Sequence, residues 1–300
     1  MTFIGAASSW GAAKRGPETA PMALWCSGVA ENLQRPQCMV DWHGVIETEK
    51  PAPRKDVTLD QAYPQVLSFV SALSREVETV MEMQPLTTPV VVGGDHSVAM
   101  GTWSGVVTAL EAYKKFGLLW IDAHMDAHTP VTSVQGKWGG HFHGMPLAHL
   151  LGHGDKSLCE IASKKQKLNP RYLVLVGVHS FEPGEEELLR RLGVTVFTME
   201  DIERSGLDAV MKQALAIVAK APKGWGVSLD LDAFDPVDIK CVGTPEAGGL
   251  RLQPFLEVFS GLKLPSFPRA VEIVEYVPAK DKTGSGLQAI EKFLWLLFRK

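Results

Sequence analysis

The segment "LLWIDAHMDAHTP" places three polar groups on alternate positions directly after an apolar run. They are Asp122, His124 and Asp126. A buried strand gains nothing from two carboxylates and an imidazole, because a charge removed from water must be paired to avoid a large free-energy cost. These residues therefore point to a chemical role.

Acids and histidines also follow four other apolar runs. They are His96 after "PVVV", Glu182 and Glu185 after "LVLVGVHS", Asp230 and Asp232 in "VSLDLDAFD", and Glu275 after "VEIV". Side chains two positions apart on a strand share a face, so the members of each Asp-x-His or Asp-x-Asp pair should point the same way. In open parallel sheets, ligands bind at the carboxyl ends of the strands. We expect these groups to meet at one rim.

Several carboxylates held together repel each other unless a cation neutralises them. A carboxylate-rich set with few imidazoles suits Mn²⁺ or a similar divalent ion better than zinc, and six donors exceed what one ion needs. Taken singly, each motif has a structural alternative, such as a helix cap in "GGDHS". Together they predict a two-metal site built from these acids and histidines.

The elements that must position these groups alternate along the chain. Apolar runs such as "PVVV", "FGLLWIDAH" and "GWGVSLDLDAF" are followed by segments of helical period, such as residues 61–83. This order predicts a parallel sheet covered by helices on both sides, in one domain over residues 1–300. Residues 33–60 are polar and rich in proline, and we expect them to be irregular.

Composition excludes several classes of protein. The 300 residues are 45% hydrophobic and 21% charged, with a net charge of −4 and no basic run, so neither nucleic acid nor a membrane surface is an expected partner. Four cysteines without CxxC spacing argue against a disulfide framework. The start "MTFIGAASSW" lacks the features of a signal peptide, so we expect a cytoplasmic protein.

The motifs "GDHS", "DAHMD" and "SLDLD", in this order, resemble those of the ureohydrolases, a family that includes arginase and agmatinase. The resemblance extends from "IGAASSWGAAKRGPETAP" to "VEIVEYVPAKD". It implies a three-layer α/β/α sandwich with a mainly parallel sheet. It also implies hydrolysis of a guanidino or similar amidine group with two Mn²⁺ or other divalent ions per chain.

The resemblance also implies roles for individual residues. One ion is bound by His96, Asp122, Asp126 and Asp230, and the other by Asp122, His124, Asp230 and Asp232. Asp126 accepts a proton, Glu275 pairs with the cationic NH groups of the substrate, and Thr244 contacts the substrate. His143, in "HFHGMP", passes a proton to the leaving amine; the alternative is a solvated loop histidine.

Two features favour an arginase-type member of the family. One is "HGMP"; the other is "SFEPGEEE", which resembles an arginase segment whose acids bind the substrate α-ammonium group. Glu185 matches one of those acids, and Glu182 replaces a shorter aspartate. The alternative is that these acids only complement a helix dipole. His128 departs from the pattern, because arginases usually have an asparagine there that contacts the α-carboxylate. The neighbouring long loop offers further carboxylate-binding candidates, namely Thr132, Ser133, Gln135 and Lys137.

The predicted activity is hydrolysis of L-arginine to L-ornithine and urea by a homo-oligomer, a trimer or a hexamer. The alternatives are a guanidino acid hydrolase, an agmatinase, a formimidoylglutamase and a non-catalytic relative. The presence of all six metal ligands argues against a non-catalytic relative. A single-zinc deacetylase of the same fold is disfavoured, because His96 and Asp126 exceed its needs.

Overall fold

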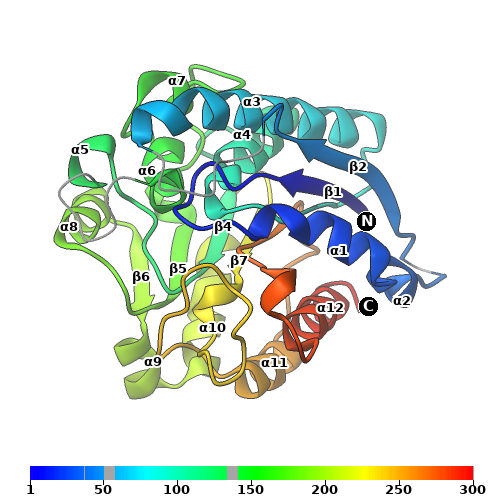
Figure 1. Ribbon diagram of the computed structural model, residues 1–300. Coiled ribbons are helices and arrows are strands. Elements are labelled where there is room, and N and C mark those ends of the chain that lie inside the picture. Colours follow the sequence, from blue (N-terminus) through cyan, green and yellow to red (C-terminus); the bar gives the residue numbers. More distant parts are fainter. Residues whose placement is uncertain (37, 51–57, 134–140, 300) are drawn as a thin grey trace.

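A central sheet of parallel strands dominates the computed structural model, which describes residues 1–36, 38–50, 58–133 and 141–299 (Figure 1). Within those residues the sheet has eight strands in the order β2-β1-β3-β8-β7-β4-β5-β6. The strands are β1 (Thr2–Ala7), β2 (Asp41–Glu47), β3 (Pro89–Val92), β4 (Gly117–Ile121), β5 (Leu173–Val178), β6 (Thr195–Thr198), β7 (Trp225–Asp230) and β8 (Val271–Val274).

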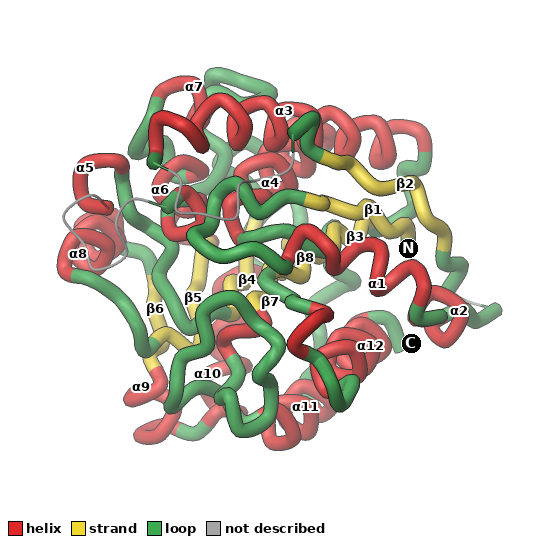
Figure 2. Tube along the Cα trace, viewed as in Figure 1, coloured by secondary structure: helices red, strands yellow, loops and turns green. Residues whose placement is uncertain are grey.

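Helices cover both faces of the sheet (Figure 2). One face packs against α3 (Leu59–Met83), α4 (Ala99–Ala109) and α6 (Pro146–Leu150). The other packs against α1 (Ala20–Cys26), α2 (Val29–Leu33), α10 (Leu207–Val218), α11 (Leu252–Gly261) and α12 (Ser285–Leu297). The other α-helices in the described residues are α5 (Pro130–Ser133), α7 (Lys156–Cys159), α8 (Pro183–Leu192) and α9 (Met199–Ser205).

Strand side chains alternate between the two layers. In β4, Leu118 and Trp120 join the core under α3 and α4, whereas Leu119 and Ile121 join the core under α10 to α12. Both faces are therefore apolar, as expected for a parallel strand buried on each side. The predicted three-layer α/β/α sandwich is confirmed. In the described part of the chain, no helix combines the length and apolar character that crossing a membrane requires.

The expectation that residues 33–60 are irregular is wrong for Asp41–Glu47. This segment forms β2, which pairs in parallel with β1 at the edge of the sheet. An edge strand has one partner and is partly exposed, so it tolerates polar residues such as His43 and the flexible Gly44. Its sequence therefore lacks the continuous apolar run that marks the central strands.

The sheet order explains how distant segments meet. Strands β3, β8, β7, β4 and β5 are consecutive neighbours, so their carboxyl ends lie side by side. Ile121 of β4 pairs with Leu229 of β7 and with Val176 of β5, which sets these ends at one level. The residues that follow these strands consequently face one another at a common rim.

Candidate active site

The turn after β3 delivers His96 to this rim. Gly93 and Gly94 have φ angles of 90° and 82°, which lie in the left-handed region. A Cβ on Gly94 would lie 2.8 Å from the carbonyl oxygen of Ala6, so a side chain does not fit there. The backbone N–H of His96 then donates to Oε1 of Glu275 at 3.0 Å, which joins the ends of β3 and β8.

A chain of buried hydrogen bonds sets the orientation of the His96 ring. The ring stacks on Trp120, with 4.1 Å between centroids and 5° between planes. Its Nε2 lies 2.9 Å from Oγ of Ser228, and that hydroxyl donates to Oε2 of Glu272 at 2.7 Å. Because the Ser228 proton goes to Glu272, Nε2 of His96 carries the hydrogen. Nδ1 therefore presents its lone pair to the site.

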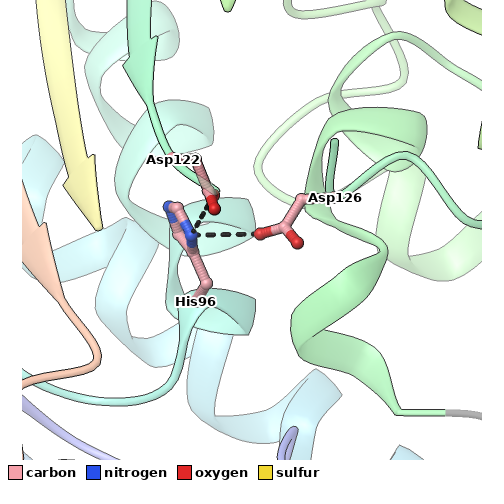
Figure 3. Close-up of side chains that lie close together, drawn as sticks. All are labelled: His96, Asp122 and Asp126. Atoms are coloured by element: carbon pink, nitrogen blue, oxygen red, sulfur yellow. Dashed lines mark ion pairs between the residues drawn. The ribbon is translucent and has the colours of Figure 1, made fainter. Parts of the chain in front are cut away.

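Three carboxylates surround that lone pair. Oδ2 atoms of Asp122, Asp126 and Asp230 each lie 3.0 Å from Nδ1 of His96. Figure 3 shows Asp122 and Asp126 pointing toward the imidazole. Among the described residues, Nδ1 has no hydrogen-bond partner, although it is buried. Acceptor atoms this close together require a positive charge between them.

A second group shares Asp122 with the first. Oδ1 of Asp122 lies 3.4 Å from Nδ1 of His124, and Oδ2 of Asp232 lies 3.3 Å from the same nitrogen. One oxygen of Asp122 therefore faces each imidazole. The Trp120 indole N–H fixes this carboxylate by donating to Oδ2 at 2.8 Å. Asp122 thus has the placement of a bridging ligand.

The side chains of each predicted pair converge, but not because they alternate along a strand. Strand β4 ends at Ile121 and β7 ends at Asp230, so Asp122 and Asp232 lie outside the strands. Instead, the carboxylate of the first aspartate accepts the backbone N–H two residues later, in an Asx-type turn. These bonds measure 2.7 Å for Asp122 with His124 and 2.8 Å for Asp230 with Asp232.

Two site residues adopt left-handed backbone conformations, which are unfavourable for residues that carry a side chain. The φ angles are 48° for Asp126 and 61° for Glu275. Such conformations cost about 1–3 kcal/mol for a non-glycine residue and persist where the surroundings enforce them. Both turns place a carboxylate against His96, which is 3.0 Å from each of them. The strained backbone conformations thus occur at residues whose carboxylates converge on His96.

Without a cation between them, these groups favour their protonated forms. Burial and the nearby charge of Asp122 raise the pKa of Asp126 to about 7. Burial and the neighbouring Asp232 and Asp122 raise the pKa of Asp230 well above its usual value. Burial opposes protonation of His96, yet the surrounding carboxylates raise its pKa well above normal. The site combines four carboxylates with two imidazoles. Among the described residues, Nδ1 of His96 and Oδ1 of Asp232 are buried without a hydrogen-bond partner. This donor set fits divalent cations.

A pocket of about 300 Å³ opens above these ligands. His143 lines it, and its Nδ1 lies 3.3 Å from Oε1 of Glu275. Burial opposes protonation of His143, but the hydrogen bond and charge of Glu275 raise its pKa. The His143 backbone N–H donates to the carbonyl of Gly11 at 3.0 Å. Thr244 lines the same pocket. His143 and Thr244 are therefore at the cavity, whereas Glu275, also predicted to face the substrate, is not among the described residues that line it.

The outer end of the pocket contains the other predicted substrate residues. Nε2 of His128 lies 3.1 Å from Oε2 of Glu182 and 3.2 Å from Oε2 of Glu185. Burial opposes protonation of His128, but Glu185 and Glu182 raise its pKa. Thr132 contacts the His128 ring, and Ser133 lines the pocket.

Part of the predicted carboxylate-binding loop is not described. Gln135 and Lys137 lie outside the described residues, so their placement stays a prediction. Upstream, the expected loop contains the one-turn helix α5, which includes Thr132 and Ser133. The backbone N–H of His128 donates to the carbonyl of Gly144 at 2.9 Å, which ties the start of this loop to the His143 segment.

Sequence reasoning missed several residues at the pocket. Oε1 of Glu246 lies 3.9 Å from Nε2 of His124, on the far side of that ring from the aspartates. His141, His179 and Phe181 line the cavity, whereas Glu246 lies beside His124 and is not among the lining residues. Glu246 was detectable, because it follows Thr244 by two residues in a loop already assigned to the substrate. The other three carried no pattern beyond their position next to predicted residues.

Comparisons with known proteins agree with this geometry. Residues 1–298 match the model of the arginase family. The chain is 33% identical over 291 residues to an arginase of Bacillus caldovelox, covering 95% of this chain and 94% of that protein. It is 33% identical over 301 residues to an arginase of Bacillus subtilis (strain 168), covering 100% and 98%. The crystal structure of native Bacillus caldovelox arginase at pH 5.6 aligns with a TM-score of 0.88 and 31% identity, covering 100% and 98% of the two chains.

Proposed function

This chain belongs to the arginase family and is a hydrolase of guanidino or amidino groups, and we propose that it converts L-arginine and water to L-ornithine and urea. The observation that carries the proposal is the position of Asp122. Its two oxygens face His96 and His124 separately, at 3.0 and 3.4 Å. Such a shared carboxylate supports a two-cation hydrolytic site.

The cofactor that fits this site is a pair of Mn²⁺ ions. His96, Asp122, Asp126 and Asp230 would hold one ion, and Asp122, His124, Asp230 and Asp232 the other. Oxygen-rich donors with two imidazoles favour manganese among the common divalent metals. When bound, such ions supply positive charge that lowers the pKa of a water molecule toward neutrality.

The protein's own groups account for the proton transfers. Asp126, whose carboxylate lies at the site 3.0 Å from Nδ1 of His96, is suited to take a proton from the attacking water, whose oxygen bonds to the planar guanidinium carbon. Glu275 accepts hydrogen bonds from the substrate NH groups. As the carbon–nitrogen bond to the alkyl chain breaks, His143, beside Glu275, gives a proton to the leaving amine. Urea and an amine result.

The rest of the substrate would occupy the outer pocket. Glu182 and Glu185 are the candidates for an α-ammonium group. Candidates for the carboxylate and the chain are His128, Thr132, Ser133, Gln135 and Thr244. We further propose a single-domain cytoplasmic protein that assembles as a trimer or hexamer. Four free cysteines support a reducing compartment.

A urea-release assay tests the proposal. Mn²⁺-loaded protein is given L-arginine, agmatine, 4-guanidinobutyrate or guanidinopropionate, and formamide release from formimidoylglutamate is measured in parallel. The expected result is urea from L-arginine, with a higher kcat/KM than from agmatine, which lacks the carboxylate. Absence of urea from all four guanidino compounds would contradict the proposal. Formamide release alone would assign the formimino substrate instead.

A further inference from the structure

The outer end of the pocket contains a pairing between groups of the protein itself. Glu182 and Glu185 face the cavity, yet the imidazole of His128 lies against both. Its Nε2 is 3.1 Å from Glu182 and 3.2 Å from Glu185. His128 is 7% exposed and Glu185 is 4% exposed, so water competes little for these contacts.

The hydrogen on this ring has one consistent position. Ionised carboxylates only accept hydrogen bonds, so Nε2 of His128 must carry a hydrogen toward the two acids. Oγ1 of Thr132 lies 3.1 Å from Nδ1 and completes the environment of the ring. The imidazole is therefore held from both sides. This arrangement is the same whether the ring is neutral or protonated, because Nε2 donates in both cases.

Glu185 consequently has few free acceptor positions for a ligand. Oε1 of Glu185 accepts the backbone N–H of Ala127 at 3.1 Å, and Oε2 accepts that of Glu182 at 3.0 Å in addition to His128. A substrate ammonium at this end would mainly exchange existing hydrogen bonds for new ones. Such an exchange contributes little net affinity, because the groups are already satisfied.

We propose that His128 is a specificity-determining residue that makes this site tolerant of guanidino carboxylates without an α-ammonium group. The inference rests on the proposed guanidino hydrolysis and extends its substrate class to these carboxylates. The pair that isolates the effect is L-arginine and 5-guanidinopentanoate, which differ only in the α-ammonium group. Their relative kcat/KM measures the discrimination at the outer end alone, because the reacting guanidino groups are identical.

The test compares the full-length Mn²⁺-loaded protein with its His128→Asn variant. In the wild type, the two values of kcat/KM should lie within about tenfold, which is less than one strong charged hydrogen bond provides. Asparagine is too short to cover both acids. The variant should therefore raise the preference for L-arginine at least about tenfold, mainly through a lower KM for that substrate. Calorimetry with L-ornithine and 5-aminopentanoate should show the same change in relative Kd, without turnover.

The outcomes separate this inference from the proposed function. Urea from neither compound in the wild type would defeat the proposed function itself. A wild-type preference for L-arginine above about a hundredfold would overturn the role of His128, since a satisfied pair of acids does not provide it. An unchanged preference in His128→Asn, or an equal change in His179→Asn, would also overturn it. His179 lines the same pocket but bonds the Gly177 carbonyl.

Discussion

His143 faces the cavity from outside the two ligand groups, and the acid beside it is Glu275. A residue that moves a proton, and does not bind metal, should affect turnover alone. We expect His143→Ala to lower kcat about 10²-fold, the lower range for a general acid or base. The metal content, measured by elemental analysis, should equal that of the wild type.

A surface substitution, His43→Ala, is the control, because His43 pairs with Glu76 away from the pocket. Loss of metal from His143→Ala would place His143 among the ligands and break the proposed division of roles. Full activity in the variant would support the alternative of a solvated loop histidine.

His149 is buried outside the active site and is satisfied as a neutral ring. Its Nδ1 donates to the Met145 carbonyl at 2.9 Å, and its Nε2 accepts the Asp155 N–H at 3.1 Å. Burial lowers its pKa, with smaller opposing effects from Met145 and Asp155. Since its pKa is lower in the folded state, the unfolded state binds more protons as pH falls through about 6.5. His149 therefore stabilises the fold above that pH and progressively less below it.

We expect His149→Gln to reduce the loss of stability between pH 7.5 and 5.5. The measurement is the free energy of unfolding in urea at both pH values, with fixed Mn²⁺, compared with the wild type. The titration of His149 changes the free energy of unfolding by at most about 1.4 kcal/mol per pH unit. His153→Gln controls for loss of an imidazole from the same segment. An identical pH dependence in wild type and His149→Gln would refute the assignment.

At the scale of elements, Glu185 connects the start of α8 to the turn after β4. It accepts the N–H of Glu182 at the beginning of the helix and the N–H of Ala127 beside Asp126. Glu185→Gln replaces one acceptor oxygen with an NH₂ group that faces a backbone N–H. We expect the free energy of unfolding to fall by about 1–3 kcal/mol, the cost of an unsatisfied buried group.

Urea denaturation of Glu185→Gln and Glu186→Gln separates this effect from the helix dipole. Glu186 is exposed on the same first turn, so its substitution removes a similar charge without the two backbone contacts. The control should lose about 0.3–1 kcal/mol or less. Equal losses in the two variants would mean that Glu185 acts only through the dipole.

The elements differ in how far the sequence predicts them. Continuous apolar runs identified β4 and β7, because strands buried on both faces leave little choice of side chain. The edge strand β2 was missed, because its polar residues face water. The Asx turns at Asp122 and Asp230 were also missed: they depend on where a strand ends, and boundaries leave no clear periodic signal. The side chains nonetheless converge, because the Asx turns bring together the same residues that alternation along a strand would have placed on one face.

At the scale of the whole molecule, the order of the strands decides which segments meet. Alternating apolar and helical segments predict a parallel sheet, but not that β8 inserts between β3 and β7. That insertion brings Glu275 to His96 across 179 positions of sequence. The contact of His128 with Glu182 and Glu185 depends instead on the pairing of β4 with β5, since these residues follow those two strands. Periodicity reports local structure, so contacts between distant loops had to come from the three-dimensional fold.

The central claim is that one rim of this sheet holds two cations through a shared carboxylate. The most direct test is elemental analysis of the protein after equilibration with Mn²⁺ and removal of free metal, beside Asp230→Ala. We predict close to two ions per chain for the wild type. The variant should lose metal and urea release together, because Asp230 reaches His96 and also anchors the turn of Asp232. One ion or fewer per wild-type chain, or two ions and full turnover in Asp230→Ala, would contradict the account.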